Sequence, residues 1–144
     1  MKRHAGQVLS ALDPSIEPKG PSSAYGVKKA AAGAQQHLDF AARAEGASAN
    51  VKTHATHVTA SLEDAIQWTG QAIVTAQKIL AATSADEAAP LVKDLILLTT
   101  HIVDGVDANN DGQIGWQTGE GGLTQAQAHM ALMMKSEGLE GAPR

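Results

Sequence analysis

The sequence predicts an all-α protein, an antiparallel four-helix bundle or a close variant of one. Two features of composition favour this fold class: 43% of the residues are hydrophobic, many of them alanine, and only 3% are aromatic. Alanine has the highest helix propensity, and its small side chain lets neighbouring helices approach closely. A third observation is that apolar residues recur at three- and four-residue steps through most of the chain, as on one face of a helix.

A chain of 144 residues has the length of one domain. Residues 1–21 read as a proline-rich lead-in, because Pro14, Pro18 and Pro21 prevent a long helix. Within it, Val8, Leu9 and Leu12 suggest one amphipathic turn that docks on the body, and a loose tail is the alternative. We assign residues 22–138 to the helical bundle and residues 139–144 to a tail.

The bundle residues divide into four periodic stretches. The first runs from about 22 to 44, with Ser22 or Ser23 as its cap and Gly46 beyond its end. The second runs from about 48 to 83, and we expect a kink or a break at Trp68–Gly70 because glycine disfavours helix interiors. Ser84 and Glu87 form a capping box for a third helix that ends near residue 106, and a last helix covers 124–137.

Between the last two helices lies a polar stretch, residues 107–115, whose sequence is DANNDGQIG. Oxygen-bearing side chains stand at the alternate positions Asp107, Asn109 and Asp111, and Gly112 then allows a sharp turn. Gln113 can offer its backbone carbonyl, and Ile114 can anchor the loop. Calcium takes six to eight oxygen ligands on a flexible scaffold, so this spacing predicts a calcium site; an Asn- and Gly-rich turn without metal is the alternative.

These residues resemble the calcium loops of the EF-hand family and, equally, the dockerin-type loops of secreted bacterial proteins. The resemblance covers about a dozen residues and implies a cation site, not membership of a whole-protein family. It departs from the pattern at one place: the twelfth position, where the family has a bidentate acid, is Thr118. The nearest acid is Glu120, which we expect to close the site through the glycine-rich exit of the loop.

The charge distribution agrees with a cation near this loop. No Lys or Arg occurs between Lys93 and Lys135, and a region of one charge sign repels itself unless a counter-ion binds. The acids of this region are Asp94, Asp104, Asp107, Asp111 and Glu120.

Histidine is the second candidate ligand type. Five of the six histidines fall in predicted helices, and His54 and His57 are three residues apart on one helix face, a usual spacing for two ligands to one metal. In an antiparallel bundle, histidines from facing helices can converge on a transition metal (zinc, copper or nickel) or on a haem iron. The alternative is that each histidine only borders an apolar stripe and binds no metal. The five candidates are His37, His54, His57, His101 and His129.

Several classes of function are disfavoured. The chain has no cysteine, which excludes disulfides, thiolate ligands and covalent haem attachment, and it carries no catalytic motif. Its net charge of −4 argues against nucleic-acid binding, and no apolar run has the length of a membrane span. We therefore expect a non-enzymatic metal-binding bundle with a structural calcium loop.

Two alternatives stay open. One is a b-type haem or redox carrier, and the other is a structural or interaction module in which calcium only stabilises the fold. A protein partner or a homo-oligomer is compatible with each. A calcium loop stays filled where calcium is abundant, which favours a periplasmic or secreted location over a cytoplasmic one.

Overall fold

The computed structural model describes residues 1–17 and 25–139, and in these residues it is entirely helical. The predicted all-α class is confirmed. The helices are α1 (Lys2–Leu12), α2 (Gly26–Arg43), α3 (Ala49–Ala81), α4 (Ala85–Asp104) and α5 (Leu123–Ser136). No helix in the described part of the chain combines the length and the apolar character needed to cross a membrane.

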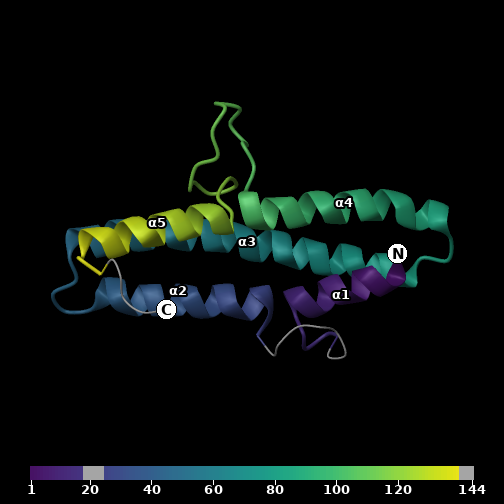
Figure 1. Ribbon diagram of the computed structural model, residues 1–144, viewed down its shortest axis with the longest axis horizontal. Helices are drawn as coiled ribbons and strands as arrows, with labels where there is room; N and C mark the ends of the chain where they lie inside the picture. Colours follow the sequence, from purple (N-terminus) through teal and green to yellow (C-terminus); the bar gives the residue numbers. More distant parts are fainter. Residues whose placement is uncertain (18–24, 140–144) are drawn as a thin grey trace.

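The helices form three rows (Figure 1), and the described residues hold five helices, so the expected antiparallel four-helix bundle or close variant is not confirmed beyond its all-α class. The long helix α3 is the middle row and contacts all four other helices. Helices α1 and α2 follow each other along one side of α3, and α5 and α4 follow each other along the other side. Each half of α3 therefore packs against two helices, one from each outer row.

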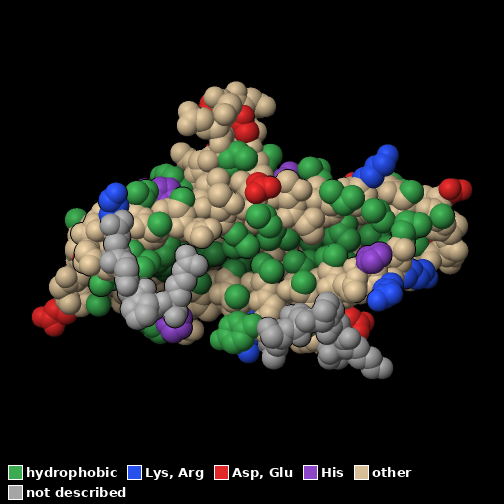
Figure 2. Space-filling view, in the orientation of Figure 1, with side chains coloured by type: hydrophobic (Ala, Val, Ile, Leu, Met, Phe, Trp, Pro, Cys, Tyr) green, Lys and Arg blue, Asp and Glu red, His purple; other side chains and the backbone are tan. Residues whose placement is uncertain are grey.

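The core is divided in the same way. The first core joins α1, the second half of α3 and α4, and it includes Leu9, Ile79 and Ile102. The second core joins α2, the first half of α3 and α5, and it includes Leu62 and Met133. Hydrophobic side chains also line the middle of the face shown in Figure 2, between the two outer rows.

Helix α3 runs without a break through Trp68, Thr69 and Gly70, so the break expected there as one alternative is absent, while the kink stays a prediction. A glycine in a helix costs only about 1 kcal/mol relative to alanine. Burial of α3 against two cores outweighs this local preference, and Thr69 itself is completely buried.

The helix ends follow the sequence closely. The Ser48 side chain caps α3 by accepting a hydrogen bond from the Val51 N–H (3.0 Å). The Ser84 hydroxyl caps α4 through the Glu87 N–H, while the Glu87 carboxylate accepts from the Thr83 N–H (3.1 and 2.8 Å). The caps expected at Ser22 and Ser23 lie outside the described residues, and α2 begins at Gly26.

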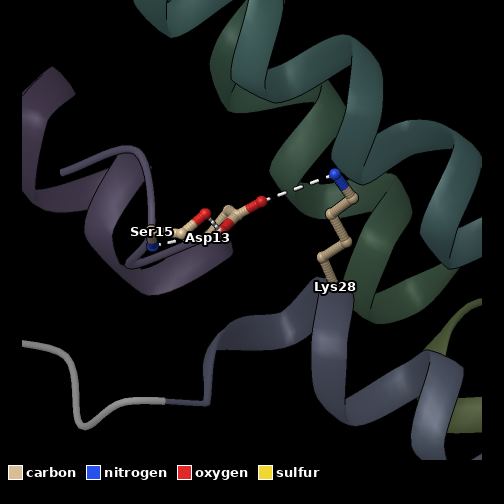
Figure 3. A network of polar contacts seen from close by, with 3 residues as sticks. All are labelled: Asp13, Ser15 and Lys28. Carbon is tan, nitrogen blue, oxygen red and sulfur yellow. Dashed lines mark hydrogen bonds and ion pairs between the residues drawn. The ribbon is translucent and has the colours of Figure 1, made fainter. Parts of the chain in front are cut away.

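Residues 2–12 form a full helix where the sequence suggested a single amphipathic turn. Leu9 and Leu12 lie in the first core. The end of α1 is tied to the start of α2 by Asp13, whose carboxylate accepts hydrogen bonds from Ser15 and forms an ion pair with Lys28 at 3.4 Å (Figure 3). The hydrogen bond from the Ser15 side chain is the main reason that the pKa of Asp13 is lowered.

Candidate metal centre

Three of the five candidate histidines converge where the first half of α3 packs against α5. His54 and His57 lie on adjacent turns of α3, and His129 faces them from α5. The relative position of the two helices is fixed by Asn50, whose side-chain amide donates to the carbonyl of Met133 (3.1 Å). A second bond from the same amide, to the carboxylate of Glu137, holds the end of α5 against the start of α3 (2.8 Å).

The imidazole nitrogens of these residues are close enough to share one ion. The His129 Nδ1 lies 3.1 Å from the Nδ1 of His54 and 3.3 Å from the Nδ1 of His57. One ligand nitrogen from each of the three rings falls within 4.8 Å of the other two. In the described part of the chain, this is the only group of three or more His, Asp or Glu ligand atoms that is so compact.

All three histidines are half-buried, and for His57 and His129 the surroundings favour the uncharged ring. Burial lowers the pKa of His57, and the neighbouring His54 lowers it further. Burial likewise lowers the pKa of His129, with added contributions from His57 and His54. A neutral imidazole is the form that can bind a metal ion.

Trp116 forms one wall of the cluster. Its indole stacks on the His57 ring, with 3.8 Å between ring centroids and 19° between ring planes. It also meets His129 edge-on, at 6.4 Å and 87°. Trp116 belongs to loop 105–122, which joins α4 to α5 and projects from the body at their junction (Figure 1). The sequence analysis did not single out this residue.

The predicted calcium ligands lie in the same loop. Asp107 is half-buried, and its carboxylate accepts hydrogen bonds from the N–H groups of Asp111 and Gly112 (3.1 and 2.9 Å). The side chain of Asn109 also accepts from the Asp111 N–H (2.8 Å). The Asp111 carboxylate in turn accepts from the N–H of Gln113 (2.8 Å). These bonds curl the loop tip, where Asn109, Asp111 and Gln113 are exposed.

Glu120 points into the loop, whereas Thr118 is exposed. The Glu120 side chain is only 4% exposed, and its two oxygens accept from the N–H groups of Asn109 (3.3 Å) and Gly115 (3.0 Å). It thus joins the two arms of the loop.

A second buried acid, Asp64, fastens the loop to α3. Its carboxylate is 2% exposed and accepts from the Gly119 N–H at 2.7 Å. Burial raises the pKa of Asp64, and hydrogen bonds from the backbone of Gly119, Glu120 and Gly121 oppose that rise.

The other two candidate histidines lie elsewhere. His37 is exposed on α2. His101 lies on α4, half-buried beside Trp68, with 5.4 Å between ring centroids. Neither belongs to the group formed by His54, His57 and His129.

Comparison with protein-family models, with curated proteins and with solved structures finds no match to this chain. The interpretation of the site therefore depends on its own geometry.

Proposed function

We propose that this protein binds one divalent transition-metal ion through His54, His57 and His129. The observation that carries the proposal is the spacing of the ring nitrogens, 3.1 and 3.3 Å. Two nitrogens bound to one tetrahedral ion at 2.0–2.1 Å are separated by about 3.3 Å. The two separations from His129 are therefore within a few tenths of an ångström of the coordinating value, and the ligand nitrogens of His54 and His57 lie within 4.8 Å of each other.

The chemistry of the ligands limits the choice of metal. Three neutral imidazoles suit zinc, copper and nickel, whereas calcium and magnesium prefer oxygen ligands. Three protein ligands also leave a position for water or an exchangeable ligand, which suits a protein that takes up and releases its ion. The compact group contains no carboxylate that could serve as a general base, which favours metal binding over metal-assisted catalysis.

A haem is less well supported than a single ion. Axial nitrogens on opposite faces of a haem iron are separated by about 4 Å, twice a metal–nitrogen bond of 2.0–2.1 Å. The separations from His129 are shorter than this. His54 and His57 also approach from one helix face, so that no porphyrin plane fits between them.

A calcium ion in loop 105–122 is a second proposal, and the position of Glu120 favours it. This acid turns inward between the two arms of the loop, although it is two residues later than the EF-hand pattern requires. A carboxylate has about four lone-pair sites, so oxygens that accept N–H groups can still face an ion. With calcium bound, the loop would hold a fixed shape in a compartment rich in calcium, in keeping with a periplasmic or secreted location.

The transition-metal proposal is tested by titrating the metal-free protein with Zn²⁺ in a calorimeter, and with Co²⁺ while recording visible absorption. We expect one ion per chain. Bound Co²⁺ should give visible absorption bands with the intensity that is typical of tetrahedral coordination. Replacing His54, His57 and His129 together with alanine should abolish binding.

The matched control is the double variant His37→Ala/His101→Ala, which removes helical histidines outside the cluster. It should bind Zn²⁺ as the wild type does. Equal loss of binding in the control and in the triple variant would refute the assignment of ligands, and absence of stoichiometric binding to the wild type would refute the function.

A further inference from the structure

Outside the three ligands, Trp116 is the residue whose ring contacts the metal centre. The indole lies nearly parallel to the His57 ring at stacking distance, and its edge approaches His129 on the other helix. It therefore borders two of the three ligands, which belong to different helices. In the described part of the chain, the His54 ring meets only the rings of His57 and His129.

A stacked ring limits how its partner can turn. A half-buried histidine on a helix surface can rotate about its side-chain bonds, and only some orientations direct Nδ1 toward His129. The stacking contact keeps the His57 ring plane where its Nδ1 lies 3.3 Å from the Nδ1 of His129. Groups that orient a ligand in this way contribute to metal affinity without touching the ion.

The backbone on both sides of Trp116 is fixed. The Gly115 N–H donates to the buried carboxylate of Glu120 (3.0 Å), and the Gly119 N–H donates to the buried carboxylate of Asp64 (2.7 Å). Asp64 lies on α3 seven residues after His57, which is two helical turns further along the same face. The helix that carries two ligands thus also holds the loop that places the indole.

Close packing gives further support. A Cβ atom at Gly121 would come within 3.0 Å of the Ser61 Cβ and 3.1 Å of the Trp116 Cα. Ser61, one turn after His57 on α3, is completely buried. The loop backbone, α3 and Trp116 therefore meet with no space for a side chain between them.

We infer that Trp116 is a positioning residue of the metal centre, which holds His57 in its coordinating orientation and makes loop 105–122 part of the site. This inference rests on the proposed transition-metal site and adds a residue that determines its affinity. The ordering of the loop and the binding of the ion then favour each other.

The experiment measures the dissociation constant for Zn²⁺ in Trp116→Leu and Trp116→Phe. Outer-shell partners of metal ligands typically contribute 10- to 100-fold to affinity, so we expect about a 10-fold or greater loss in Trp116→Leu. Trp116→Phe keeps an aromatic ring over His57 and should restore most of the affinity. The melting temperature of each metal-free variant reports whether the fold is retained.

Trp68→Leu is the control, because Trp68 also lies beside a histidine, His101, with 5.4 Å between ring centroids and 59° between ring planes, but outside the metal centre. Its removal weakens the first core and should leave the Zn²⁺ affinity unchanged. In a Trp68→Phe background Trp116 is the remaining tryptophan, and one equivalent of Cu²⁺ should quench its fluorescence.

The possible outcomes separate the two proposals. If the wild type and Trp116→Leu bind Zn²⁺ with equal affinity, the role of Trp116 is refuted and the histidine site stands. If Trp116→Phe is as weak as Trp116→Leu, stacking is not the cause of the affinity. If the wild type binds no transition metal, the proposed function itself fails.

Discussion

The carboxylate of Asp64 in α3 accepts a hydrogen bond from the Gly119 N–H at 2.7 Å, across 55 positions of sequence. This contact connects the middle of the longest helix with the end of the longest loop. Asp64 is 2% exposed, so the carboxylate end of this contact is shielded from water, whereas Gly119 is exposed.

Replacement of Asp64 should therefore destabilise the fold. Asp64→Ala removes the acceptor that fastens the Gly119 N–H to α3, and one such hydrogen bond contributes about 0.5–1.5 kcal/mol to stability. Asp64→Asn keeps an acceptor oxygen and should lose less. Urea denaturation monitored by circular dichroism measures both, and equal stability of Asp64→Ala and the wild type would show that the contact contributes nothing.

The stability of the metal-free protein should fall as the pH falls below about 6.5. His57 and His129 have lowered pKa values in the folded state, mainly because they are buried, so the unfolded chain binds more protons. The loss begins near the ordinary histidine pKa of 6.5 and levels off below the lowered values.

Denaturation curves between pH 5 and 8 test this dependence, and the double variant His57→Ala/His129→Ala should flatten it. An identical pH dependence in that variant would assign the effect to other groups. Because protons compete with metal for the same nitrogens, Zn²⁺ affinity should fall in the same pH range.

Calcium should raise the melting temperature of the wild type, and Asp107→Ala/Asp111→Ala should abolish that shift. The double variant removes two side-chain oxygens that the proposed site requires. Asp94→Ala/Asp104→Ala is a control with the same change of charge, because both residues belong to α4 and precede the loop. A calcium shift that survives in Asp107→Ala/Asp111→Ala would remove the loop from consideration as the site.

Gly105→Ala should disturb the base of the loop. Gly105 has a φ of +82°, and a Cβ there would overlap the backbone oxygen of Glu120 and approach the Ile114 side chain to 2.7 Å. Gly46→Ala is the control, since Gly46 has the same φ with open space around it. We expect Gly105→Ala to lose more stability than Gly46→Ala in thermal melts, and equal losses would mean that only backbone conformation matters.

Gly70→Ala should stabilise the protein by up to about 1 kcal/mol, because alanine is favoured over glycine in a helix interior. The site lies inside α3, and a Cβ there meets no atom within 4 Å. A rise in the urea midpoint checks this expectation. A decrease would indicate that the chain needs flexibility at Gly70.

The sequence predicted the helical class and the pairing of His54 with His57, because both follow from local periodicity. It named His129 among five candidates but did not show which of them would join this pair. That depends on which helices pack together, and α5 packs on the half of α3 that carries the pair while α4 packs on the other half. The same division of the core separates His101 from the cluster.

Two further residues of the site, Trp116 and Asp64, have sequence features that could have indicated their role. Trp116 is one of only two tryptophans and stands in a polar, glycine-rich loop, where an aromatic side chain needs a partner. Asp64 interrupts the apolar stripe of α3 between Leu62 and Ala65, and a buried acid requires hydrogen-bond donors. Of the kink or break expected at Gly70, the break was wrong because tertiary packing outweighed local propensity.

Since α3 is a wall of both cores, global unfolding of this helix removes the order of both halves of the molecule together. A helix of 33 residues is about 50 Å long, so this dependence extends across the whole protein. A ligand at 100 times its dissociation constant stabilises the native state by about 2.7 kcal/mol. An ion held by His54, His57 and His129 would thus slow hydrogen exchange in α1, a helix that it never contacts.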